Sequence, residues 1–146
     1  MSMVQPADLI GSWDLVRVDL IGPGSESLPP AFGGKPQGVL HYMADGRMVA
    51  IIQSARREAF AGGRRGAPDA DWGRGGKSFT AYAGDWELRG ARVIHHVDFN
   101  SYPNDVGVDY IRHARIEGGL LVLETPIDGP PDSRPMRLIW KRKSAR

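Results

Sequence analysis

Along most of this chain, apolar and polar residues alternate one by one, and turns interrupt the alternation about every ten residues. A period of two places successive side chains on opposite faces of a β-strand, whereas a helix would need apolar residues three or four positions apart. The pattern therefore predicts an all-β fold with little helix. Strands are expected over residues 12–20, 37–44, 47–53, 79–88, 91–100, 107–116, 119–125 and 135–142.

Three short segments between these strands have the composition of hairpin turns: Asp45-Gly46, Arg89-Gly90 and Glu117-Gly118-Gly119. Glycine and aspartate tolerate the positive backbone angles that such turns require. Hairpins make consecutive strands neighbours, and eight strands joined in this way can close into a barrel with room for one small ligand. We therefore expect a closed, antiparallel, up-and-down eight-stranded barrel, with an open sandwich of the same strands as the alternative.

The composition fits one globular domain over residues 1–146. The chain has 146 residues, of which 41% are hydrophobic and 25% are charged, and it contains no cysteine. The lack of cysteine excludes disulfides and thiolate nucleophiles and agrees with a reducing compartment, so the cytoplasm is the expected location. No apolar run approaches the roughly 20 residues of a membrane span, and residues 1–6 lack the layout of a signal peptide. No membrane partner is expected.

Two predicted connections are long, over residues 21–36 and 54–78. The second is rich in glycine and arginine, and long loops inside a compact domain often serve as lids. We expect residues 54–77 to form a lid-like loop at the barrel mouth, and residues 143–146 to form a basic tail. Arginine-glycine segments also occur in nucleic-acid-binding proteins, but this loop lacks the interleaved aromatic residues that stack on single strands. Nucleic acid is therefore not the expected partner.

Several short motifs occur in the order seen in a known family. They are Gly11-Ser12-Trp13, Gly38-Val39-Leu40-His41-Tyr42, Asp45-Gly46-Arg47-Met48, Ala81-Tyr82-Ala83-Gly84, Val93-Ile94-His95-His96-Val97, Pro103-Asn104 with Gly107, and Arg112. From Leu9 to Trp140 the chain resembles the lipocalin-like domain family of bacteria and fungi, which implies a small calycin-type β-barrel. Residues 55–77 depart from the family pattern, because relatives look more helical there.

One histidine interrupts a face that is otherwise apolar. His95 shares its predicted face with Val93, Val97 and Phe99. It is either a core histidine bonded to a backbone carbonyl, or an acid/base group whose pKa near neutrality suits proton transfer. The family resemblance favours the second interpretation. A β-bulge in this strand would turn His96 inward in its place.

Arg112 is a lone charge on another apolar face. Burial of an unpaired guanidinium costs several kcal/mol, so this side chain needs a carboxylate, a set of carbonyls or a ligand anion as its partner. The structural alternatives are an ion pair with Glu87 or Glu124, or stacking on the ring of Trp13. The functional alternative is a carboxylate, enolate or phenolate of a ligand, which the planar guanidinium is well suited to hold.

Two tyrosines also fall on the predicted inner face, because Tyr42 is in phase with Leu40, and Tyr82 with Trp86. A buried tyrosine hydroxyl needs a hydrogen-bond partner, and a few polar groups in an apolar cavity are typical of small-molecule sites. The predicted catalytic residues are His95, Arg112, Tyr82 and Tyr42. The residues expected to contact the ligand are Leu40, Val97, Phe99, Tyr110, Trp86 and Trp140, the last of which is also expected to fill the barrel floor.

The motifs of metal and cofactor sites are lacking. The histidines at positions 41, 95, 96 and 113 include no pair two or four residues apart, and no glycine fingerprint for a dinucleotide occurs. The expected function is a cofactor-independent enzyme that acts by proton transfer on a small apolar molecule with a carbonyl or phenol, as an isomerase, dehydratase or cyclase. The alternative is a non-catalytic carrier or sensor of a small hydrophobic ligand. Whether copies of the chain associate is left open.

Overall fold

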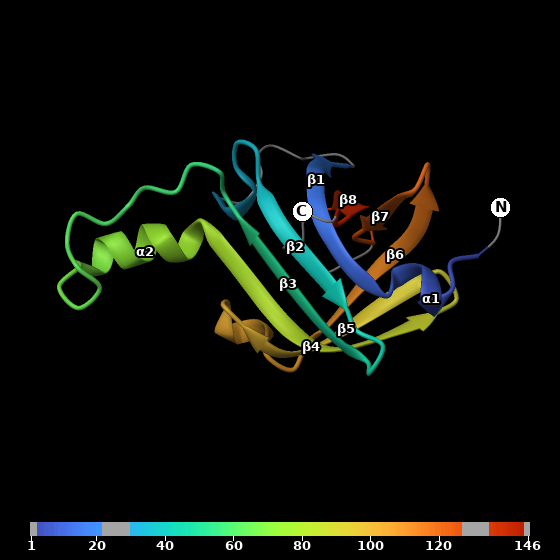
Figure 1. Cartoon of the computed structure of the whole chain (residues 1–146). Helices are drawn as coiled ribbons and strands as arrows, with labels where there is room; N and C mark the ends of the chain where they lie inside the picture. Colours follow the sequence, from blue (N-terminus) through green and yellow to red (C-terminus); the bar gives the residue numbers. More distant parts are fainter. Residues whose placement is uncertain (1–2, 22–29, 127–134, 145–146) are drawn as a thin grey trace.

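The computed structural model of the chain describes residues 3–21, 30–126 and 135–144. Eight antiparallel strands form one closed barrel, in which each strand pairs with the next along the chain and the last pairs with the first (Figure 1). The strands are β1 (Gly11–Leu20), β2 (Gln37–Tyr42), β3 (Arg47–Gln53), β4 (Phe79–Arg89), β5 (Arg92–Asn100), β6 (Asp109–Glu117), β7 (Leu120–Glu124) and β8 (Met136–Arg142). The prediction of a closed up-and-down barrel is confirmed.

Helix is confined to short segments. These are α1 (Pro6–Leu9), α2 (Asp69–Lys77) and two 3-10 turns, η1 (Pro30–Phe32) and η2 (Pro103–Asp105). Within the described part of the chain, no helix has the length and apolar character needed to cross a bilayer. Much of the predicted loop over residues 21–36 and half of the predicted basic tail lie outside the described residues.

The predicted hairpin turns are present, and glycine provides their left-handed backbone. Gly46, Gly90, Gly118 and Gly119 have φ angles of 96°, 61°, 56° and 81°. These angles are strained for residues with a Cβ atom, which explains why glycine occurs at each turn. The turns place consecutive strands side by side and so determine the strand order of the barrel.

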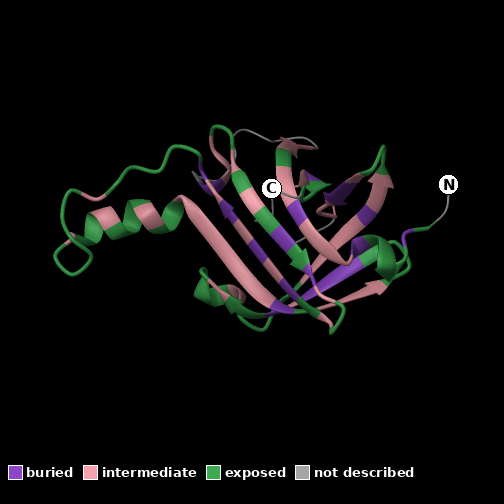
Figure 2. Ribbon diagram, in the orientation of Figure 1, coloured by how far each residue is buried: buried purple, intermediate pink, exposed green. Residues whose placement is uncertain are grey.

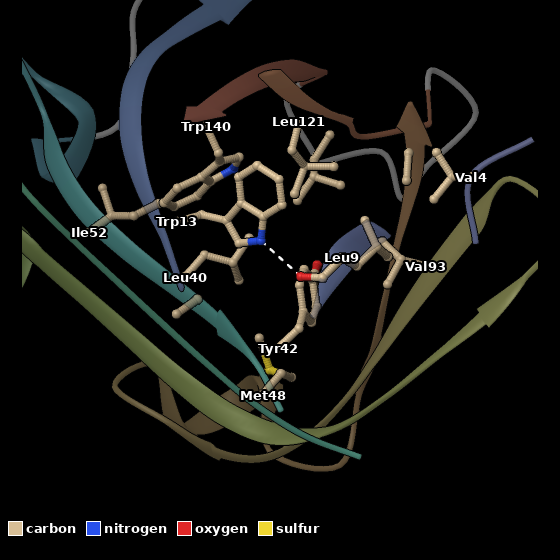
Figure 3. Close-up of a cluster of buried hydrophobic side chains, with 13 residues drawn as sticks. Val4, Leu9, Trp13, Leu40, Tyr42, Met48, Ile52, Val93, Leu121 and Trp140 are labelled. Atoms are coloured by element: carbon tan, nitrogen blue, oxygen red, sulfur yellow. Dashed lines mark hydrogen bonds between the residues drawn. The ribbon is translucent and has the colours of Figure 1, made fainter. Parts of the chain in front are cut away.

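One end of the barrel is sealed by α1 and the start of β1. The indole nitrogen of Trp13 donates a hydrogen bond to the carbonyl oxygen of Leu9 at 2.9 Å (Figure 3). The Arg142 guanidinium lies 4.4 Å from the centre of the Trp13 ring and donates to the carbonyl oxygens of Asp8 and Ile10. Trp13, Leu9 and Met48 belong to one cluster of buried apolar side chains (Figure 3). We call this packed end the floor.

A β-bulge interrupts the pairing of β4 with β5. Ala83 pairs with Phe99, but its neighbour Gly84 pairs with Val97, so Asp98 has no partner opposite it. A bulge shifts the alternation of every later residue in the strand. Phe99 therefore points outward and is 64% exposed, and the expectation that it contacts an interior ligand is wrong.

Residues 54–78, called the arm here, contain a helix where the sequence analysis expects only a loop. Asp69 and Asp71 in the first turn of α2, with Arg74 and Lys77 in the last, match the helix dipole and compensate for its glycines. The arm extends away from the barrel (Figure 1), and most of it is exposed (Figure 2). Within the arm, Phe60 and Trp72 pack on each other with ring centres 5.0 Å apart.

Candidate functional site

The barrel interior contains a cavity of about 200 Å³. Trp13 at the floor pairs with Arg142 at the end of β8, whereas the cavity is lined by Met136 and Leu138 near the start of β8. The cavity therefore lies toward the end of the barrel opposite to α1. Its walls are apolar apart from a few polar side chains. The lining residues are Phe32, Leu40, Ala50, Ile52, Thr80, Tyr82, His95, Tyr110, Arg112, Leu123, Met136, Leu138 and Trp140.

Three side chains from adjacent regions of the wall form a buried hydrogen-bonded chain. The hydroxyl oxygen of Tyr42, at the end of β2, lies 2.6 Å from Nε2 of His95 on β5. The hydroxyl oxygen of Tyr82 on β4 lies 2.8 Å from Nδ1 of the same ring. Tyr42 and His95 are almost completely inaccessible to solvent, and Tyr82 reaches the cavity. Both ring nitrogens of His95 are thus engaged by tyrosine hydroxyls.

His95 is held in its neutral form. Burial, followed by the nearby charge of Arg112 and by His96, lowers the pKa of His95 to about 3. Burial also raises the pKa of Tyr42 and the pKa of Tyr82, although the Arg112 charge partly offsets both shifts. The expectation of a pKa near neutrality for His95 is therefore wrong, because desolvation disfavours the imidazolium. At physiological pH the side chains of Tyr42, His95 and Tyr82 are therefore all uncharged.

Arg112 on β6 is the charged side chain of the cavity wall. It donates to the carbonyl oxygen of Ile111 at 3.0 Å, and its guanidinium lies 5.1 Å from the centre of the Tyr110 ring. Among the described residues, no carboxylate lies within ion-pair distance of it. Its positive charge is therefore available to a molecule in the cavity.

The structural partners considered for Arg112 are engaged elsewhere. Glu87 pairs with Arg89 at 2.6 Å, and with His96 at 3.6 Å when that ring is protonated. Glu124 pairs with Arg115 at 2.8 Å and with Arg137 at 2.7 Å. The cation over the Trp13 ring is Arg142. The structural alternatives for Arg112 are thus wrong for all three partners.

Tyr110 supports Arg112 and is itself held from outside the barrel wall. Its hydroxyl donates a short hydrogen bond to Asp105 in η2 and accepts one from the Asn100 amide at 3.0 Å. Its ring meets the Tyr82 ring edge-on, with centres 4.9 Å apart. Asn100 lies beyond the bulge, so simple alternation assigns it to the outer face. Asn100 could not be predicted for this reason, and Asp105 could not be predicted because it lies in η2, outside any strand.

The predicted site residues divide into three groups. His95, Arg112, Tyr82, Leu40, Tyr110 and Trp140 line the cavity. Tyr42, Trp86 and Val97 are turned into the barrel but do not line the cavity. Tyr42 lies behind His95, and the Trp86 indole packs on the Tyr42 ring and donates a hydrogen bond to the Met43 carbonyl oxygen. Phe99 is outside. Tyr42 cannot be a catalytic residue in the sense of touching a ligand, which corrects its predicted assignment.

Other lining residues were missed, although most have a sequence signal. Ala50 and Ile52 alternate with outward residues of β3, Thr80 is in phase with Tyr82, and Leu123 is in phase with Leu121. Phe32 belongs to η1, outside any strand, and alternation says nothing about it. His96 faces outward, where its Nδ1 lies 2.7 Å from Asp109, so the choice between the two histidines falls on His95.

A wider recess of about 530 Å³ adjoins the cavity. Phe32 and Thr80 line both spaces, and the recess is otherwise bordered by the end of α2 and by Tyr102. The cavity and the recess thus meet at Phe32 and Thr80, on the side of the barrel where α2 leads into β4. The arm borders this opening and does not cover it.

The neutral, buried His95 predicts a measurable pH dependence of stability. Unfolded His95 binds a proton below its usual pKa near 6.5, whereas the folded form does so only near pH 3, so the free energy of unfolding falls as pH drops through this range. The contribution of His95 to the slope of the free energy of unfolding with pH approaches about 1.4 kcal/mol per pH unit. Urea unfolding from pH 7 to pH 4 should show a shallower loss for His95→Gln than for the wild type.

His96 supplies the matched control for this prediction. Its hydrogen bond to Asp109 raises its pKa, so its own contribution is present at low pH and is lost as pH rises through that raised pKa. His96→Gln should therefore keep the acid-side loss that His95 causes. An equal pH dependence in the His95→Gln variant and the wild type would show that His95 is not buried as a neutral ring.

A closed antiparallel barrel that is packed at one end and holds a small, mostly apolar cavity at the other defines a class of proteins that bind small molecules inside the barrel. The chain belongs to the lipocalin-like domain family, whose model matches residues 10–143. Fold and family together indicate a small hydrophobic ligand. Comparison with curated proteins found no match. Within the described residues, no three histidine or acidic side chains converge as a metal site.

Among solved structures, the chain is similar to the crystal structure of a mutant of the fluorescent protein UnaG. The identity is 10% and the TM-score is 0.44, with 97% of this chain and 100% of that chain covered.

Proposed function

We propose that the barrel is a cofactor-independent enzyme that binds a small, mostly apolar molecule through a carbonyl, enolate or phenolate oxygen. The proposed reaction is an isomerisation, dehydration or cyclisation in which negative charge develops on that oxygen. One observation carries the proposal: the buried chain of Tyr42, His95 and Tyr82 reaches the cavity beside the charge of Arg112, and among the described residues Arg112 has no carboxylate partner.

The polar groups of the wall suit stabilisation of an oxyanion. The Tyr82 hydroxyl and the Arg112 guanidinium both line a cavity whose other walls are largely apolar. In such surroundings water does not screen their action on a developing charge, and loss of one oxyanion donor typically costs about 10²- to 10³-fold in rate. Because His95 is neutral and bonded at both nitrogens, it supports Tyr82 rather than acting as a free base.

The size of the cavity limits the ligand. A cavity of roughly 150 Å³ is known to accommodate benzene, so a cavity of about 200 Å³ accommodates one substituted ring or a fragment of similar size. Any longer part of the ligand would have to extend past Phe32 and Thr80 into the wider recess.

A second candidate function is that of a non-catalytic carrier. The observation that favours it is the absence, among the described residues that line the cavity, of a side chain able to act as a free base, since both nitrogens of His95 are occupied. A carrier would use Tyr82 and Arg112 only to orient a polar head group. The two candidates therefore agree on binding and differ on turnover.

Binding is tested with 4-nitrophenol, whose ionised form absorbs visible light. We expect the bound phenol to ionise at a lower pH than the free phenol, because Arg112 and Tyr82 favour the phenolate. Tyr82→Phe should reduce the shift, while Tyr102→Phe, on the outer recess, should retain it. A bound phenol that ionises at a higher pH than the free phenol, or no binding at all, would contradict the proposed site.

Turnover is tested by the exchange of the methyl hydrogens of acetophenone in deuterated water, followed by NMR. An oxyanion-stabilising site should accelerate this enolisation, and Tyr82→Phe should reduce the acceleration by about 10²-fold. A protein that binds acetophenone without accelerating exchange would be a carrier for this probe.

We also propose that the arm acts as a lid, since it borders the opening of the cavity. Trypsin should cleave first after Arg64 or Arg65, which are exposed, whereas Arg57 and Arg74 are held by contacts within the arm. Saturating acetophenone should slow that cleavage, as judged by mass spectrometry of the fragments. Unchanged cleavage would refute the lid, and tight RNA binding that high salt abolishes would identify the arm as a nucleic-acid segment instead.

A further inference from the structure

Tyr42 makes no contact with a ligand in the chemistry proposed above, because its hydroxyl binds His95 and does not line the cavity. We infer that Tyr42 is a positioning residue that determines which nitrogen of His95 carries the hydrogen, and thereby directs the hydroxyl hydrogen of Tyr82 into the cavity. The consequence for the ligand, that the atom facing Tyr82 must be a hydrogen-bond acceptor, rests on the proposed function. The proton order itself does not.

Tyr42 forms the buried end of this hydrogen-bonded chain. The Tyr42 hydroxyl is inaccessible to solvent, and among the described residues its one hydrogen-bond partner is Nε2 of His95. A buried hydroxyl with one partner must donate to it, since otherwise its hydrogen would be left unpaired. Nε2 must therefore accept, and it carries no hydrogen.

The order of the remaining hydrogens follows. A neutral imidazole has one protonated nitrogen, so in His95 the hydrogen lies on Nδ1 and is donated to the Tyr82 hydroxyl oxygen at 2.8 Å. Among the described residues that oxygen has no other hydrogen-bond partner. Its own hydrogen is then free to point into the cavity that Tyr82 lines.

The opposite order is disfavoured by the same contacts. If Nε2 donated to Tyr42 and Tyr82 donated to Nδ1, the Tyr42 hydrogen would be sealed in a site with no acceptor among the described residues. Both orders satisfy the two ring nitrogens, so only the Tyr42 hydroxyl distinguishes them. The Tyr82 hydroxyl faces the cavity, where a ligand can accept its hydrogen, whereas among the described residues the Tyr42 hydroxyl has no second acceptor.

The proton order has a consequence for the class of ligand. A Tyr82 hydroxyl that points its hydrogen into the cavity places one donor beside the donors of the Arg112 cation. The ligand atom at this position must then be a carbonyl, enolate, phenolate or carboxylate oxygen. An amine in the same position would place its own N–H donors against the donors of Tyr82 and Arg112.

The tautomer is measured by long-range proton–nitrogen NMR correlation of the nitrogen-labelled protein, with the His95 signals assigned by comparison with His95→Gln. Protonated and accepting ring nitrogens resonate in separate regions, so the expected result is a hydrogen on Nδ1 and an accepting Nε2. A hydrogen on Nε2 with an accepting Nδ1, or an imidazolium, would overturn the inference on the wild-type protein alone.

Two variants test whether Tyr42 is the cause. In Tyr82→Phe, Tyr42 still donates to Nε2, so the hydrogen should stay on Nδ1. In Tyr42→Phe, nothing holds Nε2 as an acceptor, so the two nitrogen signals should move toward each other as both tautomers become populated. A single Nδ1–H tautomer in a folded Tyr42→Phe variant would show that Tyr42 does not set the order.

The ligand class is tested separately, with acetophenone as an acceptor and neutral aniline as a donor of similar size. The wild type should bind acetophenone at least tenfold more tightly, and the preference should shrink in Tyr82→Phe. An equal or stronger preference for aniline would overturn the assignment of an acceptor ligand. Failure of both to bind, with the expected tautomer present, would contradict the proposed function and leave the proton order standing.

Discussion

Arg112→Met is expected to reduce the affinity for 4-nitrophenolate by roughly tenfold to a hundredfold, which corresponds to the loss of one charge-assisted hydrogen bond. Arg112 is the cation of the cavity wall, and among the described residues no carboxylate competes with a ligand for it. Methionine keeps the apolar part of the side chain and removes the charge. The bound phenol should therefore lose most of its tendency to ionise at lower pH than the free phenol.

The matched control for Arg112 lies three residues further along the same strand. Arg115 pairs with Glu117 and Glu124 on the outer surface and does not line the cavity. Arg115→Met should thus leave the affinity for 4-nitrophenolate and the ionisation of the bound phenol unchanged. If the two variants behaved alike, the charge of Arg112 would have no special access to the ligand. Absorbance titration of both variants across a range of pH gives both quantities.

Gly84→Ala is expected to unfold the barrel or to destabilise it by about 3 kcal/mol or more, at the upper end of what overpacking costs. A Cβ atom on Gly84 would lie 1.7 Å from the carbonyl oxygen of His96 and 2.8 Å from its carbon. These are backbone atoms in a paired strand, so they cannot move aside as a flexible side chain would. Urea unfolding followed by tryptophan fluorescence measures the loss.

A second glycine shows what the same substitution does where space exists. A Cβ atom on Gly73 in α2 would meet nothing within 4 Å, and alanine favours a helix over glycine by roughly 0.5 to 1 kcal/mol. Gly73→Ala should therefore leave stability unchanged or slightly increased. A Gly84→Ala protein as stable as the wild type would mean that the bulge between β4 and β5 can be repacked at little cost.

The strands could be predicted from the sequence because each of them has one inner and one outer face. Along β5, Val93, His95 and Val97 alternate with outward residues until Asp98. From that point the bulge inverts the faces, so that Phe99 points out and Asn100 reaches Tyr110. The bulge depends on the close approach of Gly84 to the backbone of β5. That approach involves residues more than ten positions apart, and alternation within one strand does not encode it.

The partners of the polar residues were harder to predict than their faces. Alternation places Tyr42, Tyr82 and His95 inside, but it does not reveal that both nitrogens of one ring meet a hydroxyl. The same holds for the pKa of His95, which depends on burial and on the Arg112 charge from another strand. The helix α2 could not be predicted from local composition either, because its glycines are typical of a loop although its terminal charges suit a helix.

The sealed floor has a kinetic consequence. Trp13, Leu9 and Arg142 close one end of the barrel, so that a molecule in the cavity exchanges with solvent at the opposite end, where Phe32 and Thr80 lie between the cavity and the recess. A bound molecule must then leave before another can enter, because the closed end admits no second molecule behind the first. For an enzyme built this way, the product would have to leave before the next substrate could enter. Substitution of Phe32 by a smaller residue would then change the maximal turnover rate more than it changes the rate of the chemical step.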